Sequence, residues 1–207
     1  SVVEASDRKS AIAAMVDDLA ATYAKDGKQK SQLALAHRRK DVHAINQSVR
    51  SARKVIDPDF GRAEVLVKTD HGPRAFAIGD RLLFTRNDRD LGVRNGMLAT
   101  ETKGDTDELT VRLDQHDGGR RVDLTFKPSE FASIDHGYAV TIHRAQGCTI
   151  DNAFVLSSKT MDNHLTYVAM TRHRENMNFY SAPDISKKQS KVRRQKPSQT
   201  VGLRRAR

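Results

Sequence analysis

The sequence predicts an α/β fold in which a parallel sheet with flanking helices is interrupted by a small antiparallel β-barrel. Three observations lead to this prediction: helix and strand patterns alternate before Pro58, short strands and tight turns occupy residues 64–126, and helical patterns return from Gly137. Helices alternating with a short apolar strand are typical of an open α/β sheet. Regular short strands separated by turns are typical of a small barrel.

The first part of the chain predicts a helix, a strand and a second helix. Residues 10–24 carry apolar side chains at helical spacing, namely Ile12, Met15, Val16 and Leu19. The apolar run 33–36 suits a buried parallel strand. Residues 40–54 predict the second helix, whose apolar stripe consists of Val42, Ile45, Val49 and Ala52.

The middle of the chain predicts four strands, over residues 81–85, 97–102, 109–113 and 122–126. Turn sequences such as Asn95-Gly96 and Gly104-Asp105 separate them. We therefore expect a first α/β part over residues 1–70, the inserted barrel over 71–133, a second α/β part over 134–182 and a basic disordered tail over 183–207.

Composition limits the class of protein. The 207 residues are 37% hydrophobic and 30% charged, which is enough for one substantial domain. No apolar run approaches the roughly 20 residues of a membrane-spanning helix. The single cysteine, Cys148, fits a reducing compartment, so we expect a cytoplasmic protein without membrane contact. Ser1 stands where an initiator Met would, and no signal-peptide pattern follows it, so we expect a piece of a longer protein.

The basic charge is concentrated at one end. The formal net charge is +10, but residues 187–207 hold nine Lys or Arg residues and no acid. The rest of the chain is therefore nearly neutral. The basic end either binds phosphate groups without sequence preference or is a solvated linker.

Residues 138–147 form the first segment with candidate chemistry. Taken as a helix that ends at Gly147, they place Ala139, Ile142, His143 and Gln146 on one face. Polar groups on a packed face need hydrogen-bond partners. This pattern is open to two interpretations, a functional pair or a polar cluster satisfied by a neighbouring loop.

Residues 162–174 form the second segment. Asp162 is a candidate N-cap of a helix on which Leu165, Val168, Ala169 and Arg172 share a face. A guanidinium is costly to bury unpaired. Arg172 therefore pairs with a carboxylate, neutralises the helix C-terminus or faces an anion.

Taken together, the two segments indicate a protein family more specifically than either segment does alone. Thr141-Ile142-His143-Arg144-Ala145-Gln146-Gly147 resembles motif V of superfamily-1 helicases, and Tyr167-Val168-Ala169-Met170-Thr171-Arg172 resembles motif VI. Residues 36–42 resemble the motif IV region. Residues 76–81, with Asn87 and residues 93–96, resemble the start of the inserted barrel in RecD-like helicases. The four segments occur in the right order over residues 10–181, and they also resemble conjugative transfer relaxases of the Ti type.

The resemblance implies a RecA-like second lobe that binds ATP and Mg²⁺ jointly with a first lobe. Arg172 would be the arginine finger, which contributes about 10³–10⁵ in rate in related systems. Arg38 or Arg39 would be a second phosphate sensor. Gln146, Gly147 and Thr171 would lie at the nucleotide, and Thr141 and His143 at single-stranded DNA. Implied partners are that DNA, the relaxase and first lobe of the same polypeptide, and proteins of the type IV secretion and coupling machinery.

The sequence departs from the family pattern in two ways. Many members have a Glu shortly after the motif V glycine, where this chain has Thr149. No phosphate-binding G-x-x-x-x-G-K-(S/T) loop occurs. The pair Asp107-Glu108 follows polar residues and is interpreted as a hairpin turn, not as a magnesium site. We therefore predict that the chain alone is inactive as an ATPase.

Other candidate sites are weaker. Arg86, Arg89, Arg94 and Asn95 cluster around one expected loop, which either holds DNA phosphates or is an ordinary solvated hairpin. The histidines lack metal-site spacing and Cys148 has no second thiol, so no metal is expected.

The sequence thus favours the second motor lobe of a DNA helicase in plasmid transfer. The alternatives are a non-catalytic DNA- or protein-binding module of the relaxase and a lobe of a RecD-type repair helicase.

Overall fold

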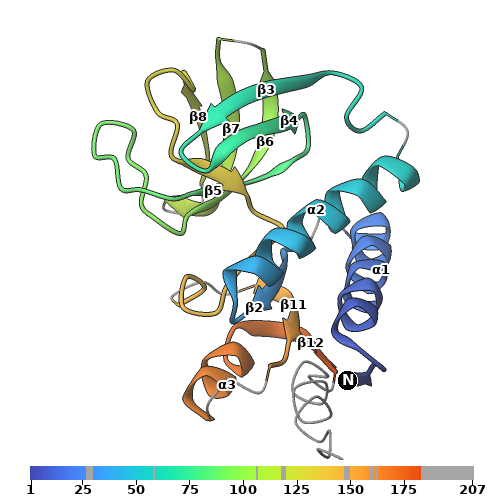
Figure 1. Ribbon diagram of the computed structural model, residues 1–207. Helices are drawn as coiled ribbons and strands as arrows, with labels where there is room; N and C mark the ends of the chain where they lie inside the picture. The colour runs from blue at the N-terminus through green and yellow to red at the C-terminus, as the bar shows by residue number, and fades with distance from the viewer. Residues whose placement is uncertain are drawn as a thin grey trace, which may run out of the picture.

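A computed structural model describes residues 1–26, 30–57, 59–105, 107–117, 120–146, 150–158, 161 and 163–182 (Figure 1). The expected basic tail and the positions of Gly147, Cys148, Thr149 and Asp162 lie outside these residues. Within the described part, no helix is both long and apolar enough to cross a membrane.

The core of the fold is a five-stranded sheet in which every pair of neighbouring strands is parallel. Its strand order is β1 (Val2–Glu4), β12 (His173–Ser181), β11 (Ile150–Leu156), β2 (Gln32–Ala36) and β10 (Ala139–Thr141). The predicted strand at 33–36 is β2, and all five of its residues are buried. Burial on both faces explains why that strand is a continuous apolar run and not an alternating one.

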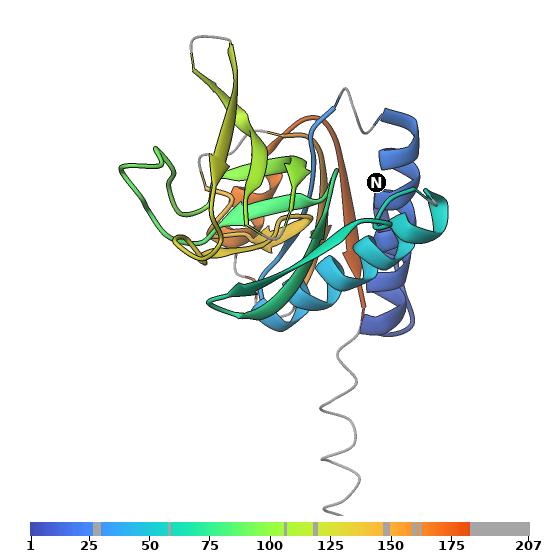
Figure 2. The same cartoon turned by 90° about the horizontal axis from the view of Figure 1, so that it is seen from above.

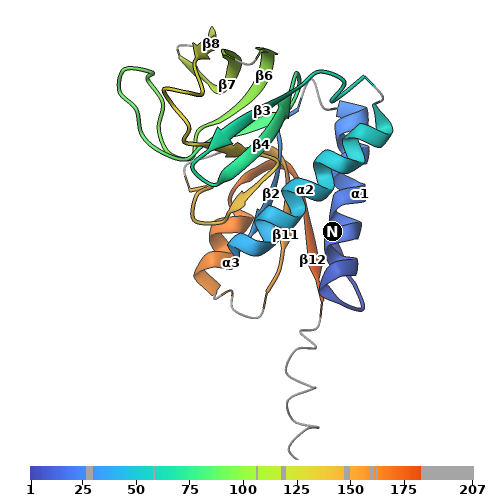
Figure 3. The same cartoon turned by 45° about the horizontal axis from the view of Figure 1, so that its top comes forward.

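Helices cover both faces of this sheet. On one face lie α1 (Arg8–Asp26) and α2 (Arg39–Ile56), which pack against Ala34 and Ala36 of β2. On the other face lies α3 (Asn163–Met170), which packs against Leu33 and Leu35. Figures 1 and 3 show α1 and α2 together on one side and α3 on the other. The two helices predicted in the first part of the chain are confirmed, because α1 and α2 cover them.

The inserted part consists of antiparallel strands. One sheet is the hairpin β3 (Glu64–Thr69) and β4 (Gly72–Ala77). The other has the order β8 (Arg120–Phe126), β7 (Leu109–Asp117), β6 (Leu98–Gly104), β5 (Arg81–Phe84) and β9 (Ile134–His136). All four strands predicted in the middle of the chain are present. Instead of one closed barrel, two antiparallel sheets share an apolar cluster that includes Val67, Phe84 and Phe131.

The strands of the insertion extend beyond the expected limits of 71 and 133. The first limit falls in the turn of the β3–β4 hairpin, and the second falls directly before β9. Figure 2 shows these strands gathered beside the helices and the parallel sheet. Strands as short as β9 have too few residues to show a periodic pattern in the sequence.

A buried polar network joins the insertion to the parallel sheet. Asp80 is fully buried, and both of its carboxylate oxygens accept from Nε of Arg50 on α2, at 3.1 and 3.0 Å. The Tyr138 hydroxyl donates to the same carboxylate at 2.6 Å. Arg53 donates to the Gly79 carbonyl oxygen and to the Tyr138 hydroxyl oxygen, both at 2.7 Å. These contacts fix the insertion against α2 because each group would be costly to bury alone.

Candidate functional site

The described residues of the segment expected to be a helix, 138–146, do not form one. Ala139–Thr141 is strand β10, which pairs in parallel with β2, and residues 142–146 form a tight turn. The Thr141 carbonyl oxygen accepts from the backbone N–H of Arg144 at 2.9 Å and of Ala145 at 3.1 Å. The expectation was wrong because Val140 and Thr141 are β-branched and complete the edge of the sheet, which outweighs the helical spacing of the polar residues.

The turn separates polar from apolar side chains. Ile142 and Ala145 are fully buried and pack in the cluster beneath α3. His143 and Gln146 are exposed to solvent. The polar pair therefore needs no protein partner, and both side chains are accessible to a ligand.

Two loops meet at the carboxyl end of the parallel sheet. Thr141 ends β10, and the His143 ring lies 6.3 Å from the ring of His37, which follows β2. Because parallel strands end at the same edge of a sheet, residues that follow β2 and β10 are neighbours. Arg38 and Arg39 directly follow His37 and begin α2.

The two neighbouring arginines have different surroundings. Arg38 donates from Nε to Asp41 at 2.9 Å, and Arg8 on α1 binds the same carboxylate at 2.9 and 2.6 Å. Burial opposes the ionisation of Asp41, but the bonds from Arg8 and Arg38 outweigh it and hold its pKa below the usual value. Arg39 is exposed and has no hydrogen bond or ion pair with any described residue.

Arg172 lies at the opposite, amino end of the sheet. It ends the turn after α3 and directly precedes β12, and its carbonyl oxygen accepts from the N–H of Ile150, the first residue of β11. The register places Ala36, Leu156 and Tyr180 together at the carboxyl end, and Ile150 and His173 at the amino end. The seven residues of β11 separate these ends by about 20 Å at ~3.3 Å per residue. The structure therefore does not bring Arg172 together with Arg38 or Arg39.

The Arg172 guanidinium folds back over the end of α3. Its Nε donates to the Val168 carbonyl oxygen at 3.0 Å, and Nη2 donates to the Thr171 hydroxyl at 2.9 Å. Thr171 donates to the same Val168 carbonyl oxygen at 3.1 Å. Among the described residues no carboxylate lies within ion-pair distance of Arg172. Of the alternatives for this residue, contact with the helix C-terminus is observed, and its charge has no carboxylate partner in the described part.

The helix before Arg172 has one buried and one exposed side. Leu165, Val168 and Ala169 are buried against the sheet, as expected from their spacing. Tyr167 and Met170 are exposed, at 67% and 46%. Because α3 ends at Met170, Arg172 does not continue the buried stripe, and the residue is half-buried.

The expected basic loop of the insertion lies next to the turn after β10. A Cβ atom built at Gly96 would lie 3.4 Å from the Arg144 carbonyl oxygen, so the loop backbone approaches that turn closely. Arg86, Arg94 and Asn95 are exposed, and the Arg86 guanidinium lies 5.2 Å from the centre of the Phe131 ring. A hydrogen bond within the loop stabilises it, because the Asn95 N–H donates to the Asn87 side-chain oxygen at 2.7 Å.

Some functional candidates have no signal in the sequence. The ion pair of Arg8 with Asp41 joins residues 33 apart, and no motif indicates it. The described residues contain no group of three or more His, Cys, Asp or Glu side chains suited to a metal ion.

Comparison with known proteins gives consistent matches. Residues 90–181 match the viral superfamily 1 RNA helicase core domain. The chain is 39% identical over 151 residues to a probable conjugal transfer protein TraA of Sinorhizobium fredii, which covers 73% of this chain and 13% of that protein. It is 34% identical over 129 residues to the ATP-dependent RecD2 DNA helicase of Deinococcus radiodurans, which covers 60% of this chain and 17% of that protein.

A solved structure has the same fold. A Pif1 helicase from Bacteroides, determined in complex with ADP-AlF3 and single-stranded DNA, aligns with a TM-score of 0.53 at 19% identity, over 90% of this chain and 54% of that one. The chain thus has the RecA-like helicase fold and spans about an eighth of its TraA relative. The motif V and VI segments, the fold and these relatives together show that the chain is homologous to part of the TraA conjugal transfer proteins and that residues 90–181 are similar to the core domain of superfamily-1 helicases.

Proposed function

We propose that this chain is the second motor lobe of an ATP-dependent DNA translocase that acts in conjugative plasmid transfer. The proposal is carried by the surroundings of Arg172, which ends the motif VI segment and is half-buried. Its guanidinium donates to neutral oxygens, and no described carboxylate lies within ion-pair distance. An arginine in this state has its charge available for an anion.

The nucleotide-binding part of the proposal concerns the amino end of the sheet. Arg172 supplies positive charge to the γ-phosphate of ATP as that group is transferred, while Thr171 positions the guanidinium through its hydroxyl. We also assign Gln146 and Gly147 to the nucleotide, because they stand in the motif V segment shortly before Ile150, the first residue of β11. ATP and Mg²⁺ are bound mainly by a first lobe, so this chain alone does not hydrolyse ATP.

The DNA-binding part concerns the carboxyl end. Thr141 and His143 contact single-stranded DNA, and Arg86, Arg94 and Asn95 of the neighbouring loop lie along the same strand. Arg39 is exposed and lies on this side, so we assign it to a DNA phosphate. Arg38, which is held by Asp41, has a structural role. This assignment replaces the expectation that Arg38 or Arg39 senses the nucleotide phosphate.

The remaining partners follow from the TraA relatives. We propose that a relaxase and the first helicase lobe belong to the same polypeptide, that the motor acts in the bacterial cytoplasm, and that it passes DNA to coupling proteins of a type IV secretion system.

The decisive variant is Arg172→Ala in the full-length polypeptide, compared with Arg174→Ala two residues away as a matched surface control. The proposal predicts that Arg172→Ala abolishes DNA-stimulated ATP hydrolysis while affinity for single-stranded DNA stays within about twofold of wild type, because the two ligands use opposite ends of the lobe. Little change in either quantity would instead indicate a non-catalytic binding module.

A further inference from the structure

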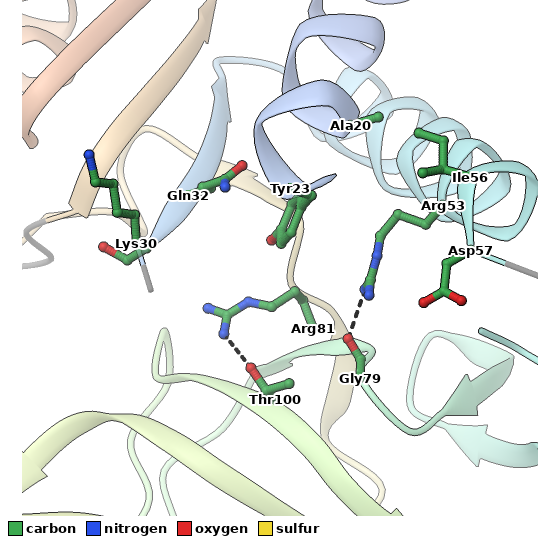
Figure 4. Close-up of a pocket in the computed structure, with 11 residues that line it drawn as sticks. Ala20, Tyr23, Lys30, Gln32, Arg53, Ile56, Asp57, Gly79, Arg81 and Thr100 are labelled. Atoms are coloured by element: carbon green, nitrogen blue, oxygen red, sulfur yellow. Dashed lines mark hydrogen bonds between the residues drawn. The ribbon is translucent and has the colours of Figure 1, made fainter. Parts of the chain in front are cut away.

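A cavity of about 410 Å³ lies outside the site described above. It is bounded by the C-terminal ends of α1 and α2, the amino end of β2 and strands β5 and β6 of the insertion (Figure 4). Its lining includes Tyr23, Lys30, Gln32, Arg53, Ile56 and Arg81. The volume lies within the range of roughly 300–1,000 Å³ that is usual for small-molecule sites.

Gln32 is the most informative residue of this lining. It is 3% exposed, yet neither its amide nitrogen nor its amide oxygen has a hydrogen-bond partner among the described residues. Leaving a buried donor or acceptor unpaired costs about 1–3 kcal/mol for each group. The amide therefore needs a ligand that offers an acceptor and a donor side by side.

Two further polar groups face the same space. The Tyr23 hydroxyl has no hydrogen-bond partner among the described residues, and Figure 4 shows it on the side of Gln32 and Arg81. The buried Nε of Arg81 also lacks a partner in the described part of the chain, although the other nitrogens of that guanidinium bind Asp114 and Thr100. Three side chains from three elements thus line one cavity and carry polar atoms that have no partner among the described residues.

The cavity also has positive charge and apolar walls. Arg53 has no carboxylate within ion-pair distance in the described part of the chain, because its contacts are the Gly79 carbonyl oxygen and the Tyr138 hydroxyl. Its guanidinium lies 5.2 Å from the centre of the Tyr23 ring. Ala20 and Ile56 supply apolar surface. A ligand that satisfies all of these groups has a planar polar edge, an apolar ring face and an anionic group.

We infer that this cavity binds an adenine mononucleotide. The Gln32 amide is suited to the N6 and N7 atoms of adenine, which present a donor beside an acceptor. A lone carboxylate or phosphate would leave the Gln32 oxygen unpaired, and it is too small for the cavity. The Tyr23 ring and Ile56 would contact the base, and Arg53 would neutralise the phosphate.

The cavity is separate from the proposed motor site. Along β2, Gln32 shares a face with Ala34 and Ala36, which contact α1 and α2. Arg172 instead follows α3, which packs on the opposite face. Occupation of the cavity would join α1, α2 and the insertion, so the nucleotide would hold the insertion in place and would not be hydrolysed.

The test is calorimetric titration of the 207-residue chain with adenosine 5′-monophosphate and, separately, with ribose 5-phosphate, which lacks the base. The inference predicts that the nucleotide binds at least tenfold more tightly than the sugar phosphate. It also predicts that Gln32→Leu weakens nucleotide binding at least tenfold, whereas the same change at exposed Gln47 on α2 has no effect. Circular dichroism verifies that both variants fold.

The ligand comparison uses the unchanged chain, so it decides the matter even where Gln32→Leu does not fold. Three results would overturn the inference: no binding of the nucleotide, equal binding of the two ligands, or displacement of the nucleotide by hexathymidylate. The last result would assign the cavity to the DNA path. None of these results depends on ATP hydrolysis, so they leave the proposed motor function untouched.

Discussion

Tyr138 and Asp80 are both fully buried, and the Tyr138 hydroxyl donates to the Asp80 carboxylate across the junction between the parallel sheet and the insertion, at 2.6 Å. The Tyr138→Phe variant removes this bond and also the acceptor of Arg53. We expect it to lower the free energy of unfolding by about 1–3 kcal/mol, as for other buried hydrogen bonds to charged groups. Urea denaturation measures the change. Tyr167→Phe, at an exposed position on α3, is the control, and equal stability of the two variants would refute the role of this pair.

Glu101 makes stability depend on pH. Burial, with a smaller effect from the charge of Asp80, raises its pKa to about 7. The folded state therefore holds this proton more tightly than the unfolded chain, and the associated stability is present below the ordinary pKa and lost as pH rises through 7. We expect Glu101→Gln to be more stable than wild type at pH 8 by roughly 1–3 kcal/mol and to lose this advantage at pH 4.5. An advantage that is the same at both pH values would contradict the assignment. Exposed Glu130→Gln is the control.

We expect Arg38 and Arg39 to contribute differently to the free energy of unfolding. Arg38→Ala removes a bond to the buried Asp41 and should lower the free energy of unfolding at pH 7 by about 1–2 kcal/mol. Because Asp41 has a lowered pKa, this contribution is present above its ordinary value and is lost as pH falls through the folded one. Arg39→Ala should leave stability unchanged. Thermal denaturation of both variants at pH 7 tests this, and a larger loss for Arg39→Ala would reverse the two roles.

The exposed arginines of the insertion loop should contribute salt-dependent DNA affinity. Replacing Arg86, Arg89 and Arg94 together with Gln should reduce the slope of log affinity against log salt by up to about 2, at ~0.7 for each phosphate contact. Fluorescence anisotropy with oligothymidylate measures the slope. The control is a second triple variant, in which Lys9, Arg62 and Lys127 are replaced with Gln. It removes the same total charge from exposed positions outside the loop. Identical slopes for the two triple variants would show that the loop is an ordinary solvated hairpin.

The sequence predicts those parts of the fold whose pattern is local and long enough to read. The strand containing Leu33 and Leu35, and the helix containing Ile45 and Val49, have apolar spacing that matches their burial. Residues 138–147 were wrongly predicted to be a helix because a three-residue strand has no period of its own, and its place in the sheet depends on pairing with β2. Strands β1 and β12 likewise depend on mutual pairing.

The sequence was sufficient to predict which residues belong to the candidate site, but not how they are arranged in space. Motif spacing identifies Arg172 and His143, whereas their places at opposite ends of the sheet depend on the strand register. Contacts such as that of Tyr138 with Asp80 join residues 58 apart and cannot be seen in a sequence. The unpaired amide of Gln32 is equally invisible, because a polar residue at the start of a strand normally faces solvent.

The assignment of two ligands to two ends of one lobe is tested most directly by the ATP hydrolysis rate of the full-length polypeptide at saturating single-stranded DNA, compared between Arg172→Lys and Arg39→Ala. Lysine keeps the charge but lacks the planar fork of the guanidinium. We predict that Arg172→Lys lowers kcat by at least about 10²-fold, whereas Arg39→Ala raises the DNA concentration for half-maximal activity and leaves kcat within about threefold of wild type. A fall in kcat for Arg39→Ala as large as that for Arg172→Lys would contradict the account, since it would place both arginines at the nucleotide.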